Sequence, residues 1–194
     1  MNLCIITPTI KSRALYLERC KHSITSQKLA DEVQVIHAIK EGVNDFGGHR
    51  TRNELIEENW QKCDYFGFVD DDNILLPGAI WRLAHIDLTK KPISVVCRML
   101  HMGPSLKDRD RQNITPNDLG DVRMGRVGSL NFWIKSEVAV KHKWRLNLYE
   151  SDWYFFQDCI TDGISPEKWK ECLIDQLRVV WIQDILAMWC IEGI

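Results

Sequence analysis

Short apolar runs alternate with segments of helical periodicity along the first half of the chain. The apolar, β-branched runs predict buried strands at 3–7, 32–39, 65–69 and 93–100. Apolar residues at helical spacing predict helices at about 12–24, at about 50–62 and from Pro77 onward. In the first helix, Ser12 is the expected cap, and Leu15, Tyr16, Cys20 and Ile24 recur at helical spacing. This order predicts an α/β fold with right-handed crossovers and a largely parallel sheet.

The periodicity fades between residues 103 and 128, where a polar stretch of alternating charge predicts a mobile loop. Beyond it, the pattern predicts a strand at 129–134, short helices at 136–143 and from Ser165, a helix that ends near Gly163, and closing strands at 177–182 and 185–191. No repeat or interdomain linker interrupts this order. We therefore expect one domain over residues 1–194.

Polar residues follow three of the predicted strands directly. These are Thr7-Pro8-Thr9, Lys40-Glu41 and Asp70-Asp71-Asp72. In parallel α/β sheets, ligands bind beyond the carboxyl ends of the strands, so these three segments are expected at one edge.

The segment "FVDDDNILLP" places three carboxylates side by side, which repel one another and need a compensating partner. Asp70 and Asp72 can share a hard cation, because Mg²⁺ takes one or two carboxylates and completes its octahedral shell with water and phosphate oxygens. The alternative is a solvated acidic turn that caps the helix expected at Pro77.

Composition narrows the class of protein. The chain has 194 residues, with 25 Lys and Arg, 27 Asp and Glu, and a formal net charge of -2, so nothing in its overall charge favours a nucleic-acid partner. The 7 cysteines form no zinc-type spacing and lie mostly in apolar runs, which indicates free buried thiols and a reducing compartment. Without a signal-peptide pattern or a stretch of roughly 18 to 20 apolar residues, a cytoplasmic protein with no transmembrane segment is expected.

Three segments carry a resemblance to a known family. They are "TPTIKSRALYLERCKHSITSQ", "GGHRTRNELIEENWQKCDYFGFVDDDNILLPGAI" and "YESDWYFFQDC". In this order they resemble glycosyltransferases of the GT-A fold, especially glycosyltransferase family 2, with its DxD motif and its later acidic segment. The resemblance covers most of residues 3 to 160.

The resemblance implies a Rossmann-like GT-A fold in which residues 1–100 bind the nucleotide and residues 101–194 bind the acceptor. It implies a metal-dependent transferase, using Mn²⁺ or Mg²⁺, that moves a sugar from a nucleotide-diphosphate sugar to a hydroxyl of a carbohydrate or glycan acceptor. A UDP-sugar is the first expectation for the donor and a GDP-sugar is the alternative. One base and direct attack would invert the anomeric centre.

The resemblance also implies roles for individual residues. Thr7, Pro8 and Thr9 would line the nucleotide pocket, and Arg52 and Asn53 would contact the nucleotide or the donor sugar. Asp70 and Asp71 would lie near the ribose and the metal. Asp72 would bind the metal directly, with Asp70 as the second carboxylate of the metal site. Asp152 would be the catalytic base, with Glu150 as its competitor. Gly128, Ser129 and Asn131 fall where family members often approach a bound sugar.

One segment departs from the family pattern. Many members end the second strand in a run such as Asp-Asp-Gly-Ser, whose aspartate reads the nucleobase, whereas this chain has "AIKEGVND". Lys40, Glu41 or Asp45 would have to substitute, so the base is left undetermined.

Other classes remain open from the residues. A haloacid-dehalogenase-type phosphatase or phosphotransferase also has DxD after an apolar strand, but nearer its start. A nucleotidyltransferase usually opens with a glycine-rich basic loop, which "TPTIKSRA" does not supply. A non-catalytic carbohydrate-binding protein is compatible with the 8 Trp but has no need of a base.

Overall fold

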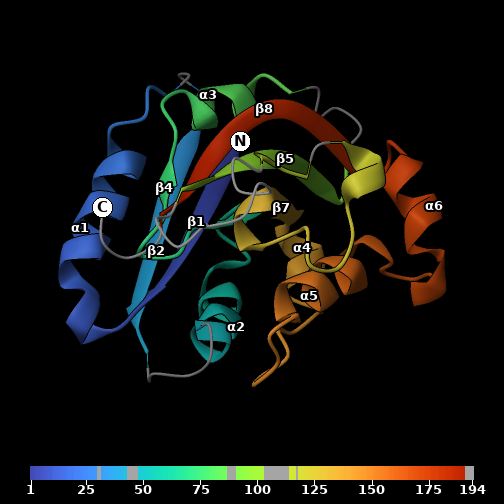
Figure 1. Cartoon of the computed structure of the whole chain (residues 1–194), viewed down its shortest axis with the longest axis horizontal. Coiled ribbons are helices and arrows are strands. Elements are labelled where there is room, and N and C mark those ends of the chain that lie inside the picture. The colour runs from blue at the N-terminus through green and yellow to red at the C-terminus, as the bar shows by residue number, and fades with distance from the viewer. Residues whose placement is uncertain (30–31, 43–47, 87–90, 103–113, 117, 191–194) are drawn as a thin grey trace.

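The computed structural model describes residues 1–29, 32–42, 48–86, 91–102, 114–116 and 118–190. Within these residues the strands form one eight-stranded sheet in the order β2-β1-β3-β7-β5-β8-β4, with β6 paired to β5 (Figure 1). The strands are β1 (Asn2–Thr9), β2 (Gln34–Glu41), β3 (Tyr65–Phe68), β4 (Ile74–Leu75), β5 (Ser94–Met102), β6 (Ile114–Thr115), β7 (Phe132–Lys135) and β8 (Val179–Cys190).

The sheet is mostly parallel along its longest strands, as the strand–helix order predicted. β1 is parallel to β2 and β3, and β5 is parallel to β8. The strand order differs from a simple parallel succession, because β7 lies between β3 and β5 and is antiparallel to both. β4 and β6 are also antiparallel to their neighbours.

Helices cover both faces of the sheet (Figure 1). They are α1 (Ala14–Thr25), α2 (His49–Asn59), α3 (Ala79–Ala84), α4 (Ser136–Ala139), α5 (Ser151–Ile160) and α6 (Trp169–Ile174). Buried residues of α1 and α3 belong to one core, whereas those of α2, α4, α5 and α6 belong to the other. No helix in the described part of the chain is long and apolar enough to cross a membrane.

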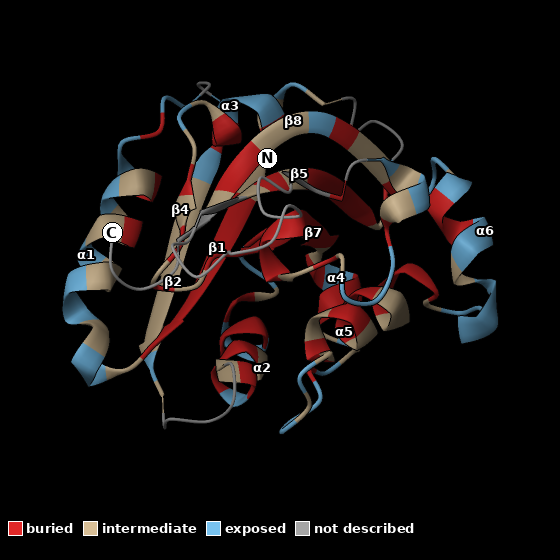
Figure 2. Cartoon of the chain, viewed as in Figure 1, coloured by how far each residue is buried: buried red, intermediate tan, exposed pale blue. Residues whose placement is uncertain are grey.

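The side chains of β1 and β3 alternate between the two cores. Cys4, Ile6, Phe66 and Phe68 pack with α2 and α5, whereas their neighbours Leu3, Ile5 and Tyr65 pack with α1 and α3. Successive residues of a strand point to opposite faces, so a strand buried on both faces is apolar throughout. All four residues of β3 are buried, and Figure 2 shows β1 buried and the outer surfaces of α1 and α6 exposed.

The first half of the chain requires three corrections. Pro77 does not begin the third helix: Gly78, with a left-handed φ of 83°, precedes α3, which begins at Ala79. Leu15 does not face the core and is 83% exposed. Ser12 does not cap α1, because it lies in a 3-10 turn at Lys11–Arg13 that leads into the helix.

The second half also differs from the expectation in places. The two strands expected at 177–182 and 185–191 are one strand, β8, whose pairing with β5 shifts register near Arg98. Residues 129–131 form a 3-10 turn before β7 rather than the start of that strand. The loop expected at 103–128 contains β6 and a 3-10 turn at Leu119–Asp121, while residues 103–113 and 117 lie outside the described residues. Strand β5 crosses the boundary expected at residue 100.

The cysteines match the expectation of free thiols. Each cysteine whose side chain the structure describes is buried and free, namely Cys4, Cys20, Cys63, Cys97, Cys159 and Cys172.

Gly67 gives a direct test of the central packing. A Cβ at this position would lie 2.6 Å from Cη2 and Cζ3 of Trp133 on the neighbouring strand β7. We expect Gly67→Ala to lower the free energy of unfolding by about 1–3 kcal/mol, because the ring has to leave its packed position. Urea denaturation measures the change. In a Trp133→Phe background, Gly67→Ala should lower the free energy of unfolding by less, because phenylalanine lacks the second ring of the indole. An equal loss in both backgrounds would contradict this packing.

Candidate active site

The carboxyl ends of β1, β2 and β3 meet at one edge of the sheet, as expected from their sequence order. Thr9 and Glu41 are paired in register at the ends of β1 and β2. The Thr9 hydroxyl donates a hydrogen bond to Asp71 Oδ2 at 2.7 Å, just beyond β3. All three polar segments singled out in the sequence are therefore neighbours.

The aspartates lie on a tight turn. The amide of Asn73 donates to the carbonyl of Asp70 at 2.9 Å and closes the turn. Arg19 of α1 holds the turn from outside by donating to the carbonyl of Asp72 at 2.9 Å. Asp70 pairs with Arg52, whereas Asp71 and Asp72 share Arg13.

Asp71 anchors the turn to the fold. It is only 1% exposed, and its two carboxylate oxygens accept hydrogen bonds from the hydroxyl of Thr9 at 2.7 Å and from Nη1 of Arg13 at 2.9 Å. Both oxygens therefore have partners within the protein. This middle aspartate holds the turn against the end of β1.

Asp72 carries the least compensated charge of the turn. Burial, together with the charges of Asp70 and Asp71, raises the pKa of Asp72 to about 6, although Arg13 opposes the shift. Arg13 Nη1 lies 3.2 Å from Asp72 Oδ2. A second cation near Asp72 would relieve this cost.

The carboxylates suit a hard divalent cation. Oxygen ligands are what Mg²⁺ and Mn²⁺ prefer, and Asp70 and Asp72 supply them next to each other. Among the described residues, no three or more His, Cys, Asp or Glu side chains are placed so that they could hold one metal ion together. The remaining ligands would therefore be water and substrate oxygens, which is the usual arrangement for Mg²⁺ at a phosphate site.

Arg52 supplies a buried positive charge. It projects from the first turn of α2, is 2% exposed, and forms an ion pair with Asp70. Its guanidinium carbon also lies 4.7 Å from the centre of the Trp144 ring. A charge this deeply buried needs such partners, because desolvation would otherwise be costly.

Asn53 binds the protein chain through both ends of its side chain. Its Nδ2 donates to the carbonyl of Trp144 at 3.1 Å, and its Oδ1 accepts from the amide of Trp144 at 2.8 Å. The resemblance implied a contact with the nucleotide or donor sugar, whereas these bonds direct the carboxamide toward Trp144.

Asp152 lies in the first turn of α5 and accepts a hydrogen bond from the amide of Ser129 at 2.9 Å. Burial raises its pKa to about 6; Arg52 and the Ser129 amide oppose the shift and Asp70 adds to it. Asp152 therefore shares one electrostatic environment with Arg52 and Asp70. Glu150, the competing base, is the residue before α5 and forms no side-chain cap on that helix.

The turn before β7 presents the Ser129 amide to Asp152. Asn131 holds this turn by accepting from the amide of Gly128 at 2.9 Å and donating to the carbonyl of Cys97 at 3.2 Å. The sequence singled out Gly128, Ser129 and Asn131, and the structure brings the first two next to Asp152.

The remaining predicted residues differ in accessibility. Thr7 is fully buried, and its hydroxyl donates to the carbonyl of Val69 at 2.7 Å and lies 2.8 Å from Nε2 of His37. Pro8 is also buried, whereas Glu41 is exposed at the end of β2. Of the residues expected at the nucleotide, Glu41 has the most open side chain on this edge.

Sequence reasoning missed two residues of this region, Arg13 and Trp144. The repulsion among three consecutive aspartates signalled that a cation was needed but did not say which one. No comparable signal marked Trp144, which lies in an irregular segment far from Arg52 in sequence.

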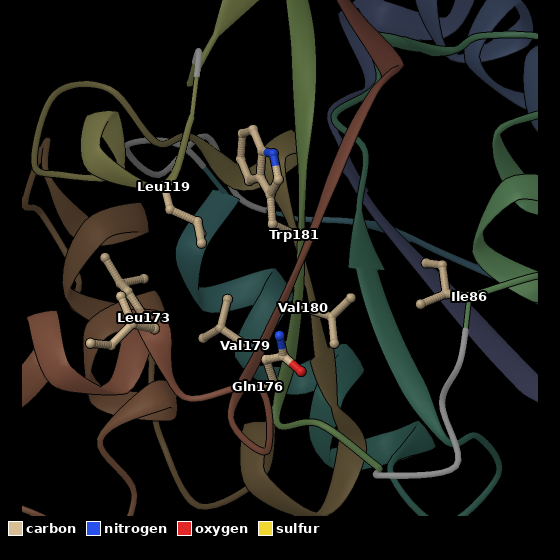
Figure 3. Close-up of a pocket in the computed structure, with 8 residues that line it drawn as sticks. Ile86, Leu119, Leu173, Gln176, Val179, Val180 and Trp181 are labelled. Atoms are coloured by element: carbon tan, nitrogen blue, oxygen red, sulfur yellow. The ribbon is translucent and has the colours of Figure 1, made fainter.

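A separate hollow lies where α6 leads into β8 (Figure 3). It is lined by Ile86, Leu119, Leu173, Ile174, Gln176, Val179, Val180 and Trp181. These residues are almost all apolar and include none of the site residues predicted from the sequence.

The sequence matches no protein-family model and no curated protein. The fold, however, is similar to those of solved structures. Residues 1–349 of S. aureus TarS, in complex with UDP-GlcNAc, have a TM-score of 0.70 at 12% identity, and the match covers 100% of this chain and 59% of that one. The mannosyltransferase PcManGT from Pyrobaculum calidifontis, in complex with GDP-Man and Mn²⁺, has a TM-score of 0.60 at 11% identity, over 96% of this chain and 56% of that one.

A third similar structure is closer in length. A glycosyltransferase involved in glycosylation of the major capsid of PBCV-1 has a TM-score of 0.55 at 11% identity, and the match covers 100% of this chain and 95% of that one. The present chain spans only 59% of the TarS chain of residues 1–349 and 56% of PcManGT. These similarities confirm the GT-A fold expected from the sequence resemblance.

The raised pKa of Asp72 predicts a pH-dependent cost. Its pKa is about 6 in the folded protein against an ordinary value of 3.8, so the folded state binds this proton more tightly than the unfolded chain does. Stability is therefore lost as Asp72 ionises with rising pH. We expect Asp72→Asn to be more stable relative to wild type at about pH 8 than at about pH 5, by about 1 kcal/mol. Urea denaturation in a chelator measures this difference.

The pH dependence of the wild type has to be compared with that of Asp72→Asn, because His37 changes stability with pH in the direction opposite to Asp72. Its pKa is lowered to about 4 by burial and by Lys21, so its protonation costs stability at low pH in both proteins. As a matched control, Asp71→Asn should lower stability at both pH values by about 1–3 kcal/mol, because Arg13 and Thr9 lose an anionic acceptor. A constant difference between Asp72→Asn and wild type across this range would show that Asp72 ionises normally.

Proposed function

We propose that this protein is a metal-dependent glycosyltransferase that moves a sugar from a nucleotide-diphosphate sugar to an acceptor hydroxyl, with inversion by single displacement. The observation that carries the proposal is that Asp152 lies in the electrostatic environment of the Arg52–Asp70 ion pair, at the carboxyl edge of a GT-A-fold sheet, where Asp70 adjoins Asp72 on the same turn. Asp152 senses the charges of both Arg52 and Asp70, which supports one shared reaction centre.

Asp72, with Asp70, would hold Mn²⁺ or Mg²⁺. When bound, the metal supplies Lewis-acid stabilisation of the charge that grows on the departing diphosphate. The neighbouring carboxylates make this a place where a cation is favoured, as the raised pKa of Asp72 indicates. Arg52 offsets the charge of Asp70 and keeps a fixed positive charge beside the same centre.

Asp152 would be the general base. A carboxyl with a pKa of about 6 is mostly ionised at neutral pH, yet it is a stronger proton acceptor than an ordinary aspartate. The Ser129 amide holds one of its oxygens and so orients the other. These features support removal of the acceptor proton by Asp152 and favour it over Glu150.

The donor is proposed to be a UDP-sugar, with a GDP-sugar as the alternative. Support comes from the complexes of the structural neighbours, which contain UDP-GlcNAc in one case and GDP-Man with Mn²⁺ in another. Thr9, Pro8 and Asp71 would form the floor of the nucleotide site and exposed Glu41 its rim. The acceptor is proposed to be a carbohydrate or glycan bound by residues after 100, in a cytoplasmic protein.

The fold favours this function over the alternatives open from the sequence. A haloacid-dehalogenase-type enzyme would use Asp70 as its nucleophile, but here Asp70 is held by Arg52. A non-catalytic carbohydrate-binding protein has no need of a carboxylate with the raised pKa of Asp152.

The two candidate bases can be separated by mutation. We expect Asp152→Asn to lower kcat by about 10²–10⁴-fold, because the acceptor proton loses its general base. Glu150→Gln should retain most activity and serves as the matched control at the adjoining helix end. Radiolabelled sugar transfer over a panel of donors and acceptors measures both. Loss of activity in Glu150→Gln alone would transfer the role of base to Glu150.

The donor class can be identified by thermal unfolding with UDP, GDP and other nucleoside diphosphates, each with and without Mn²⁺. A ligand of the native state raises Tm, and a ligand at about 100 times its Kd adds about 2.7 kcal/mol. We expect one nucleotide to raise Tm more in the presence of Mn²⁺, and Asp72→Ala to abolish the Mn²⁺-dependent part. If no nucleoside diphosphate raises Tm, or if Asp72→Ala responds like wild type, the proposed donor and metal site are wrong.

A further inference from the structure

Trp144 is deeply buried although it belongs to no helix or strand. It lies in the irregular segment between α4 and α5 and is 1% exposed. The Asn53 carboxamide holds its backbone from α2 by two hydrogen bonds, at 2.8 and 3.1 Å, across 91 positions of sequence. The position of Trp144 therefore depends on a side chain next to Arg52.

The Trp144 ring contacts groups that adjoin both functional carboxylates. Phe68, two residues before Asp70 on the same chain segment, lies 5.2 Å from the Trp144 ring centre. Phe155, one turn after Asp152 on α5, stacks on Trp144 at 4.5 Å with an interplanar angle of 12°. Phe68 and Phe155 also meet edge to face at 5.6 Å. These three rings form a continuous packed contact between the strand that leads to Asp70 and the helix that carries Asp152.

The indole N–H of Trp144 contributes no bond to this arrangement. Nε1 is buried and has no hydrogen-bond partner among the residues that the structure describes. The ring is therefore held by the contacts of its faces and edges. These are with Arg52, Phe68 and Phe155, and also with His49 at 5.7 Å and Phe132 at 6.2 Å. A phenylalanine would keep part of these contacts and remove an unsatisfied donor, whereas a leucine would lose the aromatic face.

We propose that Trp144, clamped by Asn53, is a positioning residue that fixes Asp152 relative to the Arg52–Asp70 pair. This inference rests on the proposed function for its kinetic consequence but not for its structural one. Close-packed interiors transmit small displacements, and a misplacement of about 1 Å between reacting groups can cost about 10²-fold in rate. The proposal also assigns Asn53 a structural role, as the residue that holds Trp144, instead of a contact with the donor.

The two roles for Asn53 differ in kinetics. A donor contact would make Asn53→Ala raise the KM for the nucleotide sugar. A positioning role would lower kcat by about tenfold or more and leave the donor KM within about twofold of wild type. Trp144→Leu should give the same pattern, and Trp144→Phe should stay within about threefold of the wild-type kcat because an aromatic ring remains.

Asn59 supplies the matched control. It is a buried asparagine on the same helix α2, and its Nδ2 donates to the carbonyl of Leu55 at 2.9 Å, away from Trp144. Asn59→Ala should lower the thermal stability of the protein while kcat and donor KM stay unchanged. A loss of kcat in Asn59→Ala equal to that in Asn53→Ala would reduce the effect to general destabilisation and overturn the proposal.

A spectroscopic signature tests the positioning without any substrate. The Ser129 amide donates to Asp152 Oδ2 at 2.9 Å, so its ¹⁵N–¹H resonance reports the place of that carboxylate. We expect the resonance to move in Asn53→Ala and Trp144→Leu, and to stay in Asn59→Ala. An unmoved Ser129 resonance together with a raised donor KM in Asn53→Ala overturns the inference. If wild-type protein transfers no sugar, the proposed function fails, while the Ser129 resonance still decides whether Trp144 positions Asp152.

Discussion

Burial of β1 and β3 on both faces is the constraint on which the rest of the structure depends. Their residues alternate between two separate cores, so neither strand has a face left for polar side chains. Polar and charged groups can then appear only where these strands end. Because β1, β2 and β3 are parallel, their carboxyl ends lie at the same edge of the sheet. The candidate site forms at this edge.

The three consecutive aspartates illustrate how one turn divides its charges. Asp71 is buried, and its carboxylate pairs with the charge of Arg13 and accepts a hydrogen bond from the Thr9 hydroxyl. Its role is therefore to hold the turn in place. The charge of Asp70 is paired with that of buried Arg52 on α2, whereas the pKa of Asp72 remains raised. The turn thus satisfies one carboxylate completely and leaves another incompletely compensated, which is the charge pattern that the proposed metal site requires. Stability and chemistry are thereby separated among adjacent residues.

Asp152 reaches this centre from the other half of the chain. Its helix α5 packs in the same core as α2, and the aromatic contact through Phe68, Trp144 and Phe155 joins that helix to the strand preceding Asp70. The antiparallel strand β7 contributes as well, because the turn before it presents the Ser129 amide to Asp152. The second half of the chain is thus bound into the sheet edge that the first half creates.

The sequence by itself determined most of the strands, the parallel order of β1, β2 and β3, and the collection of Thr9, Glu41 and the aspartates at one edge, because apolar periodicity and chain order are local properties. It also singled out Arg52 and Asp152 through a family resemblance. Only the tertiary structure decided that β7 inserts between β3 and β5, that Arg13 is the partner of Asp71, and that Asn53 binds Trp144. These outcomes depend on contacts between segments far apart in the chain, for which one sequence carries no periodic signal. The same reason explains why Leu15, which its helical spacing grouped with Cys20 and Ile24, is exposed while those two are buried. Spacing identifies a face of a helix, but packing decides how much of that face is covered.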